Sequence, residues 1–177
     1  YQAQGHEFYL LNLPSANATW VYDATEQAWH RRSTWNQTEY RDDMSRPSTF
    51  MRAFGRLLVG ASQSGTIYSM NITNGLDVGG LPMRRVRRTP GLVDEHRRRF
   101  YRELELLMET GLGLATGQGS DPQVHYRYSN DGGKTFGPMR LATAGAIGAY
   151  RTRVRWWNNG SGRHRVDEIV VSDPIPW

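Results

Sequence analysis

The sequence predicts a mostly β protein with two parts: partial β-propeller-like blades, followed by an antiparallel β-sandwich-like domain. Nineteen Gly and eight Pro interrupt the 177 residues at short intervals. The segments between them alternate apolar and polar residues, as half-buried strands do. No window shows the 3.6-residue apolar period of a helix. We place the boundary near Gly79-Gly80, with a propeller-like blade segment at 1–80 and an antiparallel β-sandwich-like domain at 81–177.

The first blade-like unit covers residues 7–32. Its expected elements, in chain order, are a strand at 8–13, a turn at 14–17, a strand at 19–23, a turn at 24–27 and an aromatic strand at 28–31. An aromatic strand that ends in Asp, followed by a turn and a Trp, is typical of one blade of a propeller, especially of the kelch type. Residues 33–48 are polar and predict a surface loop.

A second blade-like unit follows, with strands at 56–60 and 66–70 around a turn at 61–65. Residues 71–80 are expected to form another loop. Radial closure of a propeller needs at least about four blades. Either later segments supply further blades, or the sequence is the end of a longer chain.

Longer and more highly charged strands are expected after residue 80. The six predicted strands are 83–88, 100–109, 123–128, 134–141, 151–157 and 163–171. Two clear hairpins and alternating faces among them favour an antiparallel sandwich or a barrel-like domain. Within the strand at 151–157, Val154 and Trp156 share one face and the arginines share the other.

Composition excludes several classes of site. The chain has no Cys, which excludes a disulfide framework, a thiolate zinc site, an iron–sulfur cluster and a cysteine nucleophile. No apolar run approaches the about 20 residues that span a bilayer. The five His are not at metal-ligand spacing, and the Gly-rich stretch at 111–119 lacks the lysine of a phosphate-binding loop. We therefore expect no enzyme, no catalytic residue, no metal and no cofactor.

Arginine dominates the charge. The formal net charge is +5, and Lys134 is the single lysine among 22 basic residues. The candidates for contact with phosphate or with another protein are Arg84, Arg85, Arg87, Arg88, Arg151, Arg153, Arg155, Trp156 and Trp157. Arg, Trp and Tyr are enriched where subunits meet, and Arg also binds phosphate with a planar fork.

Internal pairing is the competing interpretation of these arginines, and we favour it over phosphate binding. If the strands at 83–88 and 100–109 pair, the first faces a row of glutamates formed by Glu103, Glu105 and Glu109. In the last hairpin, a five-residue turn is expected to set Arg153 opposite Asp167 and Arg155 opposite Arg165. Much of the positive charge is then matched within the protein.

The most specific local motif is an Asp box over residues 129–136. Its pattern is carried by Ser129, Asp131, Gly133, Thr135 and Phe136. The Asp side chain can accept bonds from turn amides, and the glycines permit positive φ. Asp boxes occur in sialidases and other propellers as structural turns without chemistry, so one copy predicts a hairpin. It also motivates the alternative of a sialidase-like or carbohydrate-binding β-propeller fragment. A kelch-like interaction module is a third possibility, and it would form an intact closed propeller.

Nearly the whole chain resembles the packaged-DNA stabilisation proteins of short-tailed phages, which are tail hub or head-completion proteins. The motifs that carry the resemblance are those at 5–9, 19–23, 29–32, 65–68, 84–90, 103–106, 108–111, 117–123, 129–136, 148–156 and 171–174. The run Gly-Gln-Gly-Ser-Asp-Pro-Gln at 117–123 is the most specific. Members of that family are much longer, so the match corresponds to their C-terminal part. Trp156-Trp157 and Asn158-Asn159 depart from it, because relatives tend to carry basic residues there.

The resemblance implies a structural virion protein, made in the cytoplasm of a bacterial host, that closes the portal vertex after genome packaging. It implies neither catalysis nor a cofactor. The implied partners are other phage tail or portal proteins, together with further copies of the chain in a homo-oligomeric ring. We expect at most weak contact with packaged DNA and no contact with a membrane.

Overall fold

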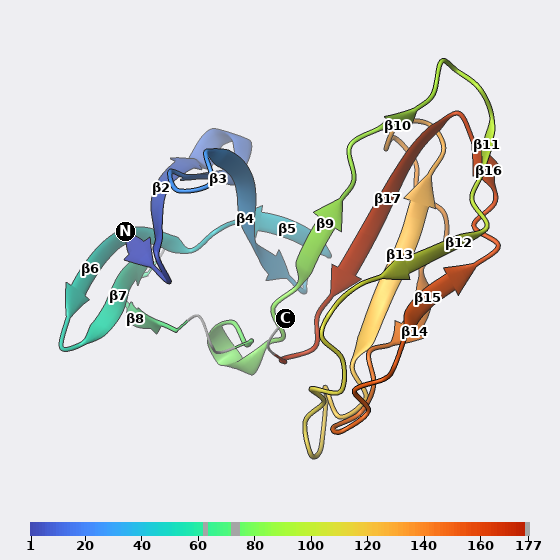
Figure 1. Ribbon diagram of the computed structural model, residues 1–177. Helices are drawn as coiled ribbons and strands as arrows, with labels where there is room; N and C mark the ends of the chain where they lie inside the picture. Colours follow the sequence, from blue (N-terminus) through green and yellow to red (C-terminus); the bar gives the residue numbers. More distant parts are fainter. Residues whose placement is uncertain (62–63, 72–74, 176–177) are drawn as a thin grey trace. The chain divides into compact units, whose positions relative to one another are not determined.

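The computed structural model describes residues 1–61, 64–71 and 75–175. It is 51% strand and 4% helix, which confirms the expected mostly β class (Figure 1). The chain forms two compact units, residues 1–73 and 74–177. The boundary expected near Gly79-Gly80 stays a prediction; in the structure both glycines belong to the second unit, in the short 3-10 helix η2 (Val78–Gly80).

The first unit begins with a five-stranded antiparallel meander in the order β1-β2-β3-β4-β5. The strands are β1 (Gln2–Ala3), β2 (His6–Leu13), β3 (Ala18–Asp23), β4 (Ala28–Asn36) and β5 (Arg41–Met44), with the 3-10 helix η1 (Pro14–Ala16) between β2 and β3. Val21 is fully buried in the central strand. Asp23 ends that strand, and its Oδ1 accepts bonds from the amides of Thr25 and Glu26. This carboxylate therefore closes the turn that the sequence predicts.

The prediction of a surface loop at residues 33–48 is wrong. In the structure β4 continues to Asn36, and β5 pairs with it as the second strand of a hairpin. Polar side chains stabilise this hairpin. The Asn36 side chain accepts the turn amides of Thr38 and Glu39 and donates to Asp43. Polarity alone suggested a loop, but Asn and Asp side chains also satisfy the backbone of tight turns.

A three-stranded antiparallel meander completes the first unit: β6 (Pro47–Ala53), β7 (Arg56–Ala61) and β8 (Ile67–Met70). Tyr1 stacks on Phe50 of β6 with ring centroids 4.5 Å apart. Up-and-down meanders are the topology of propeller blades, and a propeller that contains these strands stays a prediction. Of the turn expected at 61–65, residues 62 and 63 lie outside the described residues.

The strands of the second unit form two layers. Their bounds are β9 (Arg85–Arg88), β10 (Leu92–Val93), β11 (Arg99–Phe100), β12 (Glu103–Leu106), β13 (Gln123–Ser129), β14 (Arg140–Thr143), β15 (Val154–Trp157), β16 (Ser161–Gly162) and β17 (His164–Val171). One layer has the order β10-β17-β13-β14, and β9 also pairs with β17. The other layer is β12 with β15, and β11 with β16 continues from it.

The core of the second unit lies between these layers. Val124, Tyr126 and Val171 of the larger sheet pack against Val154 and Trp156 of β15. Alternation along β13 and β15 places every second side chain inward, as the sequence predicts for these segments. The two facing layers give the second unit the sandwich-like arrangement expected for it.

Two expected strand pairings are wrong. The strand at 85–88 pairs with β17, and β12 pairs with β15, so neither pairs with the other. The segment at 151–157 likewise does not form a hairpin with β17. Asn159 is fully buried between β15 and β16, where its amide donates to the carbonyl of Trp156. The chain enters the larger sheet only after β16, where β17 begins at His164, so the segments at 151–157 and 163–171 pair with different partners.

The strand expected at 134–141 is shorter than predicted, because only Arg140–Thr143 is extended and paired as β14. Asp131 binds the amides of Lys134 and Thr135, so they are not free for a sheet ladder. Pro138 has no amide hydrogen to offer. The strand expected at 100–109 is also divided, into β11 and β12.

Candidate functional site

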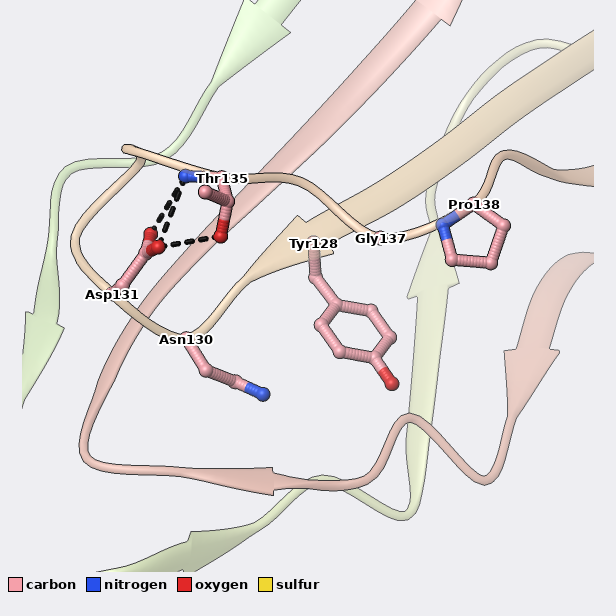
Figure 2. Close-up of a pocket in the computed structure, with 6 residues that line it drawn as sticks. All are labelled: Tyr128, Asn130, Asp131, Thr135, Gly137 and Pro138. Carbon is pink, nitrogen blue, oxygen red and sulfur yellow. Dashed lines mark hydrogen bonds between the residues drawn. The ribbon is translucent and has the colours of Figure 1, made fainter.

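The Asp box forms the turn between β13 and β14. Asp131 Oδ1 accepts the amide of Lys134 at 2.9 Å. It also accepts the amide of Thr135 at 2.9 Å, and Oδ2 accepts the Thr135 hydroxyl at 2.5 Å (Figure 2). Ser129 is almost fully buried, and its hydroxyl donates to Asp131 and accepts the amide of Gly133. Gly133 has φ of 92°, which a residue with a Cβ rarely adopts. The hydrogen bonds from Ser129 and Thr135 hold the pKa of Asp131 well below its usual range.

A hollow beside this turn is lined by Tyr128, Asn130, Asp131, Thr135, Gly137 and Pro138 (Figure 2). Asp131 is the one carboxylate among these lining residues, and the turn occupies both of its oxygens. A glycosidase site needs two carboxylates about 5–10 Å apart. The hollow therefore does not favour the carbohydrate-active alternative.

Phe136, the aromatic residue of the Asp box, joins the turn to the arginine strand. The guanidinium carbons of Arg88 and Arg127 lie 5.1 and 4.7 Å from its ring centroid. Both guanidinium groups also donate to the fully buried Glu168 of β17, each through Nε. The sequence predicted the box and the arginines separately, whereas the structure places them in one cluster across β9, β17 and β13.

This cluster fixes the charge state of Glu168. Burial alone would raise the pKa of its carboxyl group, but the hydrogen bonds and charges of Arg127 and Arg88 outweigh burial and lower it. One carboxylate thus serves two arginines, both partly exposed. Arg88 is committed to a contact within its own chain, although its expected partners were the glutamates at 103–109.

Those glutamates pair with the arginines of β15 instead. Arg153 donates to both carboxylate oxygens of Glu105, at 2.7 and 2.5 Å, and Arg155 lies 3.6 Å from Glu103. The expected positions of Arg153 opposite Asp167 and of Arg155 opposite Arg165 are wrong, because β15 pairs with β12. The same arginines are matched internally, but by other carboxylates than expected. Trp157 is part-exposed, with Arg155 over its ring.

The other candidate arginines differ in their surroundings. Arg85 is partly buried, and its side chain lies within 3.4 and 3.5 Å of the carbonyls of Asp173 and Ile175. Arg84 precedes β9, directly before Arg85. Arg87 and Arg151 are exposed, and neither has a carboxylate within 4.0 Å among the residues that the structure describes.

Trp156, predicted as an interface candidate, is a core residue instead. Its side chain is 2% exposed and packs 5.0 Å from the ring of Tyr126. The alternation that separates it from Arg153 and Arg155 directs it between the two layers. It is therefore not available to a partner while the second unit is folded, whereas its neighbour Trp157 is.

Sequence reasoning missed a buried network on the inner face of β17. Arg165 is fully buried and donates to Asp167 at 2.7 Å, to the Tyr126 hydroxyl at 2.6 Å and to the carbonyl of Asn159 at 2.7 Å. Its guanidinium lies 3.7 Å from the ring centroid of Tyr128. Burial and the neighbouring Asp167 raise the pKa of Tyr126. Charged residues inside the apolar strand at 165–171 were the available signal.

Residues 84–171 match the family described as Bacteriophage P22 Gp10, beta-sandwich. The matched range contains every strand from β9 to β17 and both arginine clusters that the geometry describes. The second unit belongs to this family. Membership agrees with the resemblance noted from the sequence, and it confirms the sandwich for the second unit. No curated protein matches the chain.

Membership of this family indicates a phage structural protein of the virion. Among the described residues, no helix has the length and apolar character needed to cross a membrane. Within the same residues, no three His, Cys, Asp or Glu side chains are grouped so that they could hold a metal ion.

Proposed function

We propose that the chain is part of a protein of the phage head–tail junction that closes the portal vertex and retains packaged DNA through contacts between subunits. The single observation that carries this proposal is that three of the candidate arginines bind carboxylates of their own chain. Arg88 is bound to Glu168, Arg153 to Glu105, and Arg155 lies beside Glu103. A surface that grips DNA needs unpaired positive charge facing the phosphates.

Physical closure needs no such charge, because a plug acts by its shape and by its contacts with neighbouring proteins. The proposed partners are other tail or portal proteins of the particle and further copies of the chain in a ring. In this proposal the buried ion pairs at β17 stabilise the sandwich, and the exposed surface supplies the contacts. Catalysis has no part in it.

The test uses the phage that encodes the chain. Particles assembled without the protein should package DNA and then release it, as measured by sensitivity of the genome to added nuclease. Arg88→Glu should cause the same release, because it places a carboxylate beside the buried Glu168 and prevents folding or assembly.

Arg87→Glu is the matched control on the same strand. Arg87 is exposed and has no carboxylate within 4.0 Å in the described part of the chain. Closure predicts that particles with Arg87→Glu keep their DNA. If particles with this variant release their DNA although the protein is incorporated at a normal level, the portal-closure proposal is contradicted. Retention of DNA by arginines that bind its phosphates is then favoured.

A further inference from the structure

Arginines lie on both sides of the extended chain around β11, which pairs with β16 in the second unit (Figure 1). Tyr101 turns inward, where its ring centroid lies 4.4 Å from the guanidinium carbon of the buried Arg165. Side chains alternate along an extended chain, so Phe100 and Arg102 are directed to the opposite, outer side. Arg98 stands two residues before Phe100 and shares that outer side.

The side that carries Arg97 and Arg99 is electrically matched. The Arg97 guanidinium lies 3.2 Å from a carboxylate oxygen of Glu95, and Arg99 donates to Asp94 at 2.9 Å. Both carboxylates belong to the tight turn before β11, in which the amide of Arg97 donates to the carbonyl of Asp94. Glu95 has φ of 42°, a conformation that turns usually give to Gly or Asn. The turn thus keeps, at a costly backbone position, a side chain that neutralises Arg97.

The outer side has no matching carboxylate. Arg98, Arg102 and Arg163 are exposed, and none of them has a carboxylate within 4.0 Å in the part of the chain that the structure describes. Arg163 follows Gly162 of β16, and the register with β11, continued by one residue, sets it opposite Arg98. Phe100, between Arg98 and Arg102 along the chain, is 82% exposed. We call Arg98, Phe100, Arg102 and Arg163 the arginine face.

The arginine face is complementary to a partner that carries both carboxylates and apolar side chains. A guanidinium group binds a carboxylate through two parallel hydrogen bonds. The Phe100 ring gains from an apolar contact, which the phosphates and sugars of a DNA backbone do not offer. The three guanidinium groups of this face are also fewer than the about six or more phosphate contacts of a strong grip on a duplex. An acidic protein segment therefore fits the face better than DNA does.

We propose that the arginine face binds an extended acidic segment of a neighbouring virion protein, with carboxylates on its guanidinium groups and an apolar side chain on Phe100. The net charge of +5 attracts such a segment and disfavours a second copy of the chain. Arginine and aromatic side chains together are typical of the residues that dominate protein interfaces. The inference deepens the proposed function, on which it rests, by naming the chemistry of one neighbour.

A labelled peptide of alternating Glu and Leu residues is the probe, and its fluorescence anisotropy with the full chain measures binding. We expect binding that weakens as the salt concentration rises. Arg98→Gln together with Arg102→Gln should raise the dissociation constant at least about tenfold. The matched control is Arg97→Gln together with Arg99→Gln, which removes the same net charge from the opposite side. No binding of the peptide, or equal effects of the two double variants, overturns the proposal.

The apolar contact at Phe100 is tested separately. Phe100→Ser should weaken binding of the Glu–Leu peptide and leave binding of a peptide of alternating Glu and Gly unchanged. Equal effects on the two peptides contradict the apolar contact. Duplex or single-stranded DNA is the competing ligand. If DNA binds more tightly than the Glu–Leu peptide and loses that affinity in the variant without Arg98 and Arg102, the face binds nucleic acid and the proposal is overturned. Thermal unfolding of each variant checks that the fold is intact.

Assembled particles of the phage that encodes the chain identify the neighbour. A chain with the photocrosslinking residue p-benzoylphenylalanine in place of Phe100 should, on irradiation, crosslink to another virion protein within a segment rich in Asp and Glu. Mass spectrometry of the crosslinked peptides reads out that segment. Crosslinks to DNA or to a segment without acidic residues, or the absence of crosslinks, overturn the proposal.

The outcome is separable from that of the proposed function. A crosslink to an acidic segment, together with particles that keep their DNA when they lack the protein, supports this inference and contradicts portal closure. Leakage of DNA from particles that lack the protein, together with no crosslink to an acidic segment, supports closure and overturns the arginine face as the contact.

Discussion

Replacing Arg165 by Met should destabilise the second unit more than any exposed arginine substitution does. Met keeps much of the apolar length of the side chain but removes its three short hydrogen bonds, to Asp167, Tyr126 and Asn159. Asp167 is only 5% exposed, so its carboxylate is then left buried without a cation. The Tyr126 hydroxyl still donates a hydrogen bond to it. Removing one partner of a buried ion pair costs about 3–5 kcal/mol.

That cost is large for a unit of this size. At about 4 °C or more per kcal/mol for a domain of up to about 100 residues, the unfolding midpoint should fall by about 12 °C or more. Urea unfolding followed by tryptophan fluorescence measures the loss of unfolding free energy, since Trp156 packs in the same core. Thermal unfolding measures the shift of the midpoint. The matched control is Arg153→Met, which also breaks an ion pair with a carboxylate but at the surface, where water screens the charges. We expect little change from it.

A double variant separates the cause. In Arg165→Met with Asp167→Leu, no charge is left unpaired, so much of the lost stability should return. The reasoning is refuted if Arg165→Met costs no more than Arg153→Met. It is also refuted if the double variant loses the sum of the two single losses.

Three further predictions concern the cluster at Glu168 and the Asp box. The pKa values of Glu168 and Asp131 are lowered in the folded protein, so these carboxylates stabilise the fold at pH above their ordinary pKa values of 4.5 and 3.8. The unfolding free energy should therefore fall as the pH drops below about 4.5, and it should fall less steeply in Glu168→Gln. An equal dependence of unfolding free energy on pH in the two proteins contradicts this. Asp131→Ala should lower the thermal midpoint because the turn amides lose their acceptor, and an unchanged midpoint contradicts a structural role. Phe136→Leu should cost about 1 kcal/mol in chemical unfolding, since Arg88 and Arg127 lose their aromatic contact; no loss argues against cation–π stabilisation.

Local patterns in the sequence predicted most of the strands. Alternation along β13 identified Val124 and Tyr126 as one face, and both are buried in the core. The Asp box predicted a hairpin turn, because its bonds run between residues at most a few positions apart. These features depend on neighbours in sequence, where propensity and side-chain spacing carry the information.

Pairing between distant strands could not be predicted in the same way. Arg88 was expected to meet the glutamates of the next strand, but its partner is Glu168, 80 positions away. Adjacent strands in an antiparallel sheet are often consecutive in sequence, whereas here β15 and β17 lie in different layers, separated only by β16. The network around Arg165 was missed because burial of a charge depends on that layer packing. Its visible signal was the run of charges inside an apolar strand.

The central claim is that the arginines form ion pairs within the protein and do not bind DNA phosphates. Titration of duplex DNA with the full chain at 50 and 200 mM salt tests this claim most directly. Committed arginines release few counterions, so the account predicts weak binding that changes little between the two salt concentrations. Six or more phosphate contacts would instead give tight binding that falls by about a thousandfold over that range. Binding of that strength and slope, abolished by Arg88→Glu in a chain that remains folded, would contradict the account.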